Sequence, residues 1–230
     1  MSKRFPKPIK LTVDATPAAK RRARRIDDRL IDLYPHAHCR LDHDNAWQLL
    51  VATILSAQCT DELVNKVTPD LFKAYPTPEA MARSTVPAIT KLIKRVGLFN
   101  GKAKNLHATA VLLADDHAGQ VPQTLDELIT LPGVARKTAN VVLGNAFGIN
   151  VGMVVDTHIG RLAHRLGFTT ADPKNAVQVE RDLMALFPAD RYTDLAHRLI
   201  FHGRALCTAR HPKCDQCPLR RSCPRQGVES

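Results

Sequence analysis

The 230-residue sequence has no apolar run that approaches the length of a membrane span, and its N-terminus, MSKRFPKPIKL, lacks the apolar centre of a signal peptide. It contains no internal repeat and no low-complexity linker. No convincing strand pattern is present either, apart from a short extended VGMVV at residues 151–155. We therefore expect an intracellular, cytoplasmic protein without a membrane partner, built as one large or two small domains.

Net positive charge is absent from the middle of the chain, although the whole carries +11. Residues 1–25 hold nine Lys or Arg against one acidic residue, and residues 201–230 hold six against two, so that the remaining 175 residues sum to −1. Basic ends of this kind can hold a polyanion such as nucleic acid. The alternative is a solvated basic patch that only aids solubility.

Helix signals recur along the whole sequence. Thr16–Pro17, Thr68–Pro69 and Thr77–Pro78 each pair an N-cap residue with a proline at the first helical position, and Gly97 and Gly119 stand where helices would end. These signals predict ten to twelve short helices and an all-α fold. Residues 1–15 show little periodicity, and we expect them to form a flexible basic arm.

Four of the six cysteines fall within 17 residues, in the spacing C-x6-C-x2-C-x5-C. Because the segment is too short to bury much apolar surface and disulfides are rare inside cells, four thiolates around one metal site are expected. The spacing alone suits zinc and an iron-sulfur cluster equally. The predicted ligands are Cys207, Cys214, Cys217 and Cys223. Arg210 and Lys213, between the ligands, are predicted to contact phosphate.

The segment LITLPGVARKTANVVLGNAFG predicts two helices joined by a tight Pro-Gly turn, with Lys137 in the first turn of the second helix. Thr124 and Glu127 form a capping box for the first helix, which we expect to end at Leu131. Such a helix-hairpin-helix offers backbone N–H groups to a phosphate without reading sequence. A cation at this positive helix end is either incidental or held ready for chemistry.

A second helix start follows at VVDTHIGRLAHRLG, where Asp156 is the predicted N-cap. Its carboxylate either only caps the helix or also takes a proton from a nearby cation. Gly160, inside the same helix, costs about 1 kcal/mol relative to alanine. The sequence gives no functional reason for that glycine.

The segments LSAQCTD, GLFN, LPGVARKTANVVLGNAFG and VVDTHIGRLAHRLG, followed by the cysteine tail, resemble in content and order the endonuclease III family of bifunctional DNA glycosylases. The resemblance covers roughly residues 25 to 225. It implies a six-helix domain at 40–150 with the helix-hairpin-helix at 124–147, and a second helical domain made of residues 16–39 and 151–230. It also implies that the four cysteines hold a 4Fe-4S cluster.

The resemblance implies a function in base-excision DNA repair. Lys137 would attack the sugar C1′ of an oxidised pyrimidine nucleotide, with Asp156 as its activating partner, and the resulting Schiff base would permit cleavage at the abasic site by β-elimination. The partner would be double-stranded DNA with damaged bases or abasic sites. We expect a monomer, associated with the nucleoid if the source is bacterial.

The family pattern also suggests how the damaged nucleotide is extruded. Gln58 would fill the vacated stack, Leu98 would wedge the opposite strand and Asp61 would line the site. The remaining residues predicted to contact DNA are Asn100, Lys102, Gly133, Ala135 and Arg136. Ala135 stands where the family hairpin usually has a second glycine, and its methyl group is expected to crowd the phosphate or resist a positive φ.

Two other readings of the sequence stay open. A noncatalytic or weakly active helix-hairpin-helix protein would bind DNA without needing Lys137 or Asp156. An adenine-specific glycosylase of the same superfamily would share the hairpin, the aspartate and the cluster but would lack a lysine at position 137.

Overall fold

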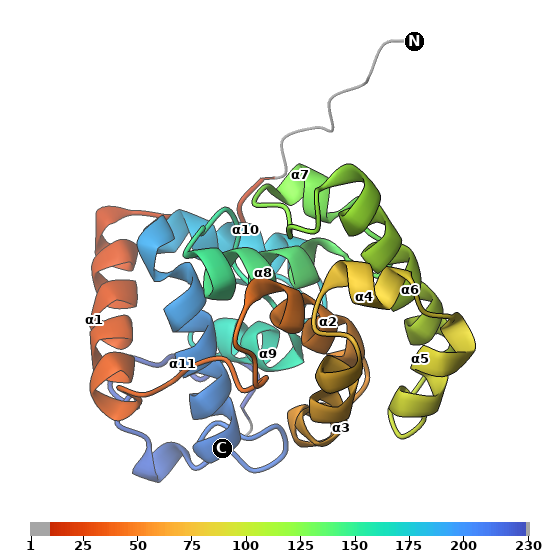
Figure 1. Cartoon of the computed structure of the whole chain (residues 1–230). Coiled ribbons are helices and arrows are strands. Elements are labelled where there is room, and N and C mark those ends of the chain that lie inside the picture. Colours follow the sequence, from red (N-terminus) through yellow and green to blue (C-terminus); the bar gives the residue numbers. More distant parts are fainter. Residues whose placement is uncertain (1–9, 229–230) are drawn as a thin grey trace. The chain divides into compact units, whose positions relative to one another are not determined.

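A computed structural model describes residues 10–228, and all regular structure in that range is helical, as the sequence predicts (Figure 1). There are eleven α-helices and two short 3-10 helices within it. None of these helices has the length and apolar character that a bilayer crossing requires. The contacts divide the chain into two compact units, which we call the hairpin unit (Cys39–Val151) and the cysteine unit (Met1–His38 with Gly152–Ser230).

The hairpin unit is built around one buried helix. Its helices are α2 (Ala46–Ser56), α3 (Asp61–Ala74), α4 (Pro78–Ala82), α5 (Val86–Ile93), α6 (Phe99–Asp116), α7 (Leu125–Leu128) and α8 (Arg136–Phe147). In α2, every residue from Leu49 to Leu55 is buried. Because α2 has almost no polar face, its neighbours α3, α6 and α8 must cover it on several sides.

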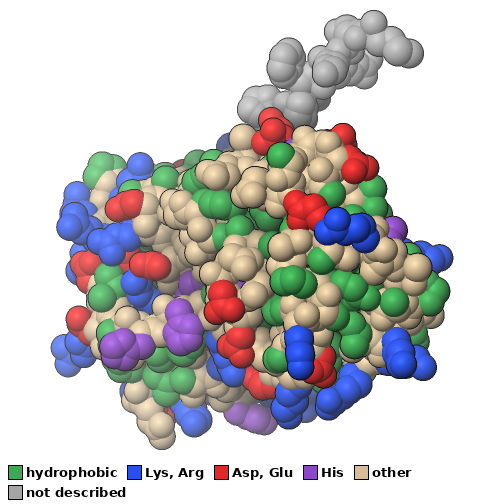
Figure 2. Space-filling model, in the orientation of Figure 1, with side chains coloured by type: hydrophobic (Ala, Val, Ile, Leu, Met, Phe, Trp, Pro, Cys, Tyr) green, Lys and Arg blue, Asp and Glu red, His purple; other side chains and the backbone are tan. Residues whose placement is uncertain are grey.

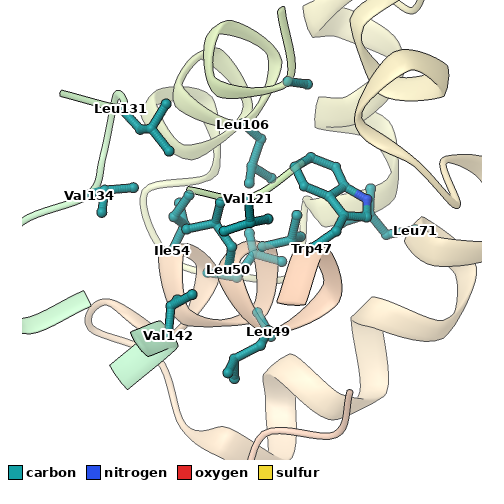
Figure 3. Close-up of a cluster of buried hydrophobic side chains, with 14 of the residues drawn as sticks. Trp47, Leu49, Leu50, Ile54, Leu71, Leu106, Val121, Leu131, Val134 and Val142 are labelled. Carbon is teal, nitrogen blue, oxygen red and sulfur yellow. The ribbon is translucent and has the colours of Figure 1, made fainter. Parts of the chain in front are cut away.

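Side chains from most of these helices meet in one core. Figure 3 shows Leu50 and Ile54 of α2 in a cluster with Leu106 of α6. Leu131 and Val134, from the turn between α7 and α8, belong to the same cluster and are 2% and 5% exposed. The turn is thus anchored to the core at both of its ends.

The structure corrects two predicted helix boundaries. Thr68–Pro69 does not start a helix, because Pro69 lies inside α3, which begins after the N-cap Thr60. A proline in a helix interior costs about 3 kcal/mol, and burial of Val64 and Leu71 on the same helix offsets that cost. The helix predicted to end at Leu131 ends at Leu128, so the following turn is longer than expected.

The cysteine unit packs helix α1 (Pro17–Leu33) together with helices and turns from residues 152–228. Its other helices are α9 (Thr157–Arg165), α10 (Ala176–Leu186) and α11 (Tyr192–Ala205), with the 3-10 turns η1 (Ala189–Arg191) and η2 (Cys214–Gln216). Arg22 of α1 donates to the carbonyl oxygens of Leu166 and Gly167, each at 2.7 Å. It also donates to Ser222 in the cysteine segment at 3.2 Å. One arginine therefore ties the first helix to the end of α9 and to the cysteine segment.

The basic face of α1 is directed to solvent. Lys20, Arg21, Arg24 and Arg25 are all exposed, and Figure 2 shows Lys and Arg side chains gathered over α1 at the left edge of the view. This face remains available to an anionic partner.

Part of the predicted flexible arm has fixed contacts. Residues 1–9 lie outside the described part of the chain, whereas the backbone N–H of Thr12 donates to Oδ1 of Asp182 at 2.9 Å. Asp182 is completely buried and also accepts a hydrogen bond from the hydroxyl of Thr169 at 2.6 Å. A buried carboxylate needs such partners, so residues 10–15 belong to the packed cysteine unit and not to a flexible arm.

Gly160 is explained by a close backbone approach. A Cβ at this position would lie 2.1 Å from the carbonyl oxygen of Pro173, far inside van der Waals contact. The glycine thus allows the segment before α10 to pass directly over α9. The helix-propensity cost that the sequence predicts for Gly160 has a packing reason.

We expect Gly160→Ala to destabilise the protein by about 1–3 kcal/mol, because overpacking against a backbone atom exceeds the gain of about 1 kcal/mol in helix propensity. Gly101→Ala is the matched control, since Gly101 is also helical and a Cβ there meets nothing within 4 Å. The control should be neutral or slightly stabilising. Thermal unfolding of both variants measures the difference, and equal melting temperatures would refute the close-approach argument.

Candidate functional site

The turn between α7 and α8 has the geometry of a rigid helix-hairpin-helix corner. Gly133 has φ +78°, and a Cβ there would lie 2.8 Å from Nδ2 of Asn105. The hydroxyl of Thr109 on α6 donates to the carbonyl oxygen of Pro132 at 2.9 Å. Gly133 and Ala135 are exposed. The corner therefore presents fixed backbone to solvent.

Ala135 differs from its sequence expectation. It is the N-cap residue of α8 and has extended backbone, with φ −89° and ψ 168°. The expectation that its methyl group would resist a positive φ is wrong, because in this turn the positive φ falls on Gly133. The side chain of Ala135 makes no capping hydrogen bond to the first turn of α8, which leaves these N–H groups suited to an anion.

Arg136 and Lys137 are the first two residues of α8, and both are exposed. Lys137 makes no hydrogen bond or ion pair with any residue of the described range 10–228. The first turn of α8 contains no acidic residue. The Lys137 amine is therefore presented next to the point where the corner would bind a phosphate.

The two segments predicted to extrude a base lie next to each other in the hairpin unit. Gln58 follows α2 and has φ +54°, and Leu98 precedes α6 and has φ +59°, a left-handed conformation that is uncommon for residues other than glycine. A Cβ at Gly97 would lie 3.5 Å from the carbonyl oxygen of Gln58. Leu98 is 63% exposed despite its apolar side chain. Nearby, Asn100 is exposed in the first turn of α6 and Asp61 is half-buried at the start of α3.

Lys102 lies beneath these segments and not at the surface. It is 5% exposed, and its Nζ donates to the carbonyl oxygens of Leu55 and Ala57, each at 2.7 Å. Burial lowers the pKa of the Lys102 ammonium, and the nearby Cys59 opposes that shift. The charged end of Lys102, which the sequence predicts to contact DNA, is hydrogen-bonded inside the protein instead of lying at its surface.

Asp156, in the cysteine unit, is the N-cap residue of α9, as the sequence predicts. Its Oδ1 accepts a hydrogen bond from the backbone N–H of Ile159 at 2.8 Å. The residue is half-buried, and Oδ2 has no hydrogen-bond partner within residues 10–228. One carboxylate oxygen therefore caps the helix while the other can accept a proton.

The four cysteines of the C-terminal segment line one cavity. All four are free thiols, and Arg165, Lys213, Arg220 and Arg225 line the same cavity. Burial, together with the neighbouring cysteines, raises the pKa of the Cys217 and Cys223 thiols. Four thiols that line one cavity can act together as ligands, and the surrounding cations complement the negative charge that four thiolates bring. The donor set fits an iron-sulfur cluster.

Two sulfur atoms lie within hydrogen-bond distance of buried side chains. Arg165 Nη1 lies 3.4 Å from Sγ of Cys207. His202 Nε2 lies 3.5 Å from Sγ of Cys217, and the Tyr34 hydroxyl lies 3.0 Å from His202 Nδ1. Burial lowers the pKa of His202 to about 4, so the ring is neutral near pH 7. With Tyr34 donating to Nδ1, the Nε2 proton is directed at Cys217.

The loop between the first two cysteines is held from α9. Arg165 donates to the carbonyl oxygens of Thr208 and Ala209 at 2.7 and 2.8 Å. Arg210 and Lys213, which the sequence predicts to contact phosphate, are exposed on this loop. The loop can thus present cations on a fixed backbone.

Sequence reasoning missed the internal roles of several polar residues, namely Lys102, Asn105, Thr109 and Arg165. The first three follow a helical spacing on α6, which was a usable signal, since polar residues on a helix face that is otherwise apolar need partners. Nothing in the sequence identified those partners. They come from α2 and from the hairpin turn, which are far away along the chain.

Two family models match the chain. Residues 51–189 match the model of HhH-GPD superfamily base excision DNA repair proteins. Residues 207–223, from the first to the last of the four cysteines, match the iron-sulfur binding domain of endonuclease III.

Curated relatives agree with these models over most of the chain. Endonuclease III of Synechocystis sp. is 52% identical over 206 residues, which cover 89% of this chain and 93% of the relative. The endonuclease III of Bacillus subtilis is 44% identical, with 87% and 90% covered. That of Escherichia coli K12 is 43% identical, with 88% and 95% covered.

Two solved structures have the same fold. One is a non-covalent endonuclease III–DNA complex, with a TM-score of 0.83 and 43% identity, covering 90% of this chain and 95% of the other. The second is a trapped covalent endonuclease III–DNA intermediate, with a TM-score of 0.83, 43% identity and coverage of 90% and 96%. The chain therefore belongs to the endonuclease III family, the bifunctional glycosylase/lyases of base-excision DNA repair that carry a 4Fe-4S cluster.

Proposed function

We propose that this protein removes oxidised pyrimidines from duplex DNA with Lys137 as its nucleophile and then cleaves the strand at the abasic site. The observation that carries the proposal is the position of the Lys137 amine, which is exposed in the first turn of α8 directly after the phosphate-binding corner. We further propose that the protein acts as a monomer in the cytoplasm, on the nucleoid if its source is bacterial.

Binding would begin at backbone phosphates. The corner at Gly133 and the uncapped N–H groups of α8 would hold one phosphate without reading sequence. Arg136, Arg210 and Lys213 are exposed cations that would contact further phosphates. Binding should therefore weaken steeply with rising salt.

Extrusion of the damaged nucleotide would use the two left-handed segments. Gln58 would enter the vacated stack and Leu98, 63% exposed, would wedge the opposite strand. Asp61 and Asn100 would line the same region. Unstacking costs least for a damaged base, which favours lesions over intact pairs.

The chemical step begins when the neutral Lys137 amine attacks C1′. The bond from C1′ to the base breaks as the nitrogen bond forms, and the base leaves with that electron pair and gains a proton. Asp156 takes the proton that the amine gives up, on the carboxylate oxygen that does not cap α9. Opening of the sugar ring gives a Schiff base, and loss of a C2′ proton then expels the 3′ phosphate.

The four thiolates of Cys207, Cys214, Cys217 and Cys223 would hold the 4Fe-4S cluster. When bound, the cluster supplies iron–sulfur bonds that cross-link the loop carrying Arg210 and Lys213. Arg165 and His202 orient two of the sulfur atoms through the hydrogen bonds described above. No step of base removal is assigned to these residues.

Borohydride trapping tests the nucleophile. Wild-type protein incubated with a duplex that contains thymine glycol or an abasic site should form a covalent complex on reduction, and Lys137→Ala should lose at least about 1000-fold of that activity. Lys94→Ala is the matched control, because Lys94 is an exposed lysine of the same unit. Equal trapping by Lys137→Ala and wild type would exclude Lys137 as the nucleophile.

Asp156→Asn separates the two roles of the aspartate. Asparagine caps a helix about as well as aspartate, so the melting temperature should stay nearly unchanged, but an amide cannot take the proton and the rate should fall about 100-fold or more. Asp156→Ala should lose the cap as well and melt at a lower temperature. If Asp156→Asn keeps the wild-type rate, the carboxylate is only a cap.

Iron and sulfide analysis tests the ligand set. Cys217→Ser should lose iron, inorganic sulfide and the visible absorption of the cluster. Cys39→Ser should keep all three, because Cys39 packs in the hairpin unit and is not among the four cysteines that line the cavity. Retention of a full cluster by Cys217→Ser, or zinc in place of iron in wild type, would contradict the assignment.

A further inference from the structure

One face of α6 carries three polar residues in the hairpin unit. Lys102, Asn105 and Thr109 follow the spacing i, i+3 and i+7, which places them within one narrow stripe of the helix. Leu98, the N-cap residue of α6, lies on the same stripe four residues earlier. Lys102 is 5% exposed and Thr109 is completely buried, so these two side chains are directed into the protein.

The first residue of the stripe fixes the end of α2. Lys102 Nζ donates to the carbonyl oxygens of Leu55 and Ala57. These two residues flank the last residue of α2, and Ala57 directly precedes Gln58. Its own backbone N–H donates to the carbonyl oxygen of Leu98 at 3.1 Å. One residue thus joins the segment of Gln58 to the segment of Leu98.

The rest of the stripe supports the hairpin corner. Thr109 donates to Pro132, and the side chain of Asn105 occupies the space that a Cβ at Gly133 would need. The three segments that the proposed function brings to DNA therefore lie against a single helix. A rigid helix keeps the spacing between its contacts constant.

We propose that the stripe Lys102–Asn105–Thr109 is a positioning element that sets the spacing between the Gln58 segment, the Leu98 segment and the hairpin corner, so that all three engage one duplex together. Lys102 is its principal positioning residue for base extrusion. The proposal rests on the proposed function of these three segments.

Backbone strain at Gln58 and Leu98 explains why a charged side chain is useful at position 102. Gln58 and Leu98 both have left-handed backbone that residues other than glycine adopt only when their surroundings hold them there. Two hydrogen bonds from an ammonium group are stronger than bonds from a neutral donor, and they also satisfy carbonyl groups at the end of a helix. Without them, the Gln58 segment would relax away from the conformation that enters the stack.

The experiment compares Lys102→Met with Lys104→Met, because Lys104 is exposed on the same helix and has no assigned role. Single-turnover excision is measured on a thymine glycol duplex, and borohydride trapping on a duplex with a preformed abasic site. Lys102→Met should lose about 10- to 100-fold on thymine glycol and less than about threefold on the abasic site, which has no base to extrude. Lys104→Met should match wild type on both.

A double-mutant cycle distinguishes positioning from a general loss of structure. If Lys102 acts through Gln58, adding Lys102→Met to Gln58→Ala should cause no further loss on thymine glycol. Independent, multiplicative losses would overturn the proposal, as would equal losses of Lys102→Met on the two substrates.

Thr109→Val tests the stripe even if Lys102→Met fails to fold, since valine has nearly the same shape and carries a methyl group in place of the hydroxyl. It should raise KM for both substrates several-fold while leaving kcat close to wild type, because the corner binds phosphate. An unchanged KM would overturn the proposal. Wild type that neither excises nor traps would instead refute the proposed function, so the two failures are distinguishable.

Discussion

Burial of α2 is the constraint on which the hairpin unit depends. A helix with seven consecutive buried residues, from Leu49 to Leu55, has no face that can be left in water, so α3, α6 and α8 are fixed around it. The end of that helix must then emerge among its neighbours, where its last carbonyl groups need donors. Lys102 supplies them. The exposed position of Gln58 thus follows from the packing of α3, α6 and α8 around α2 and from the hydrogen bonds of Lys102 at the end of α2.

The all-α class and the helix starts at Thr16, Thr77 and Asp156 could be predicted from the sequence, because caps and periodicity are local signals. The errors concern residues whose state depends on distant partners. Pro69 lies inside a helix because tertiary burial exceeds a local penalty. Lys102 is predicted to contact DNA, but its Nζ donates hydrogen bonds to carbonyl groups 45 and 47 residues earlier in the chain. No local pattern contains that information.

In the cysteine unit, α9 connects two features that look unrelated in the sequence. Asp156 caps its first turn, and Arg165, its last residue, holds the cysteine loop and donates to Cys207. Nine residues of helix span about 14 Å, so the carboxylate and the cluster segment have a fixed separation within this unit. Gly160 lies between them and allows the chain to cross this helix at close range.

The hairpin corner contains one position that cannot vary and one that can. Gly133 is fixed by its backbone conformation and by Asn105, so any side chain there would deform the turn. Ala135 has ordinary extended backbone and an exposed methyl group. A different side chain at position 135 can therefore change the exposed surface beside the first turn of α8 without straining the backbone of the turn.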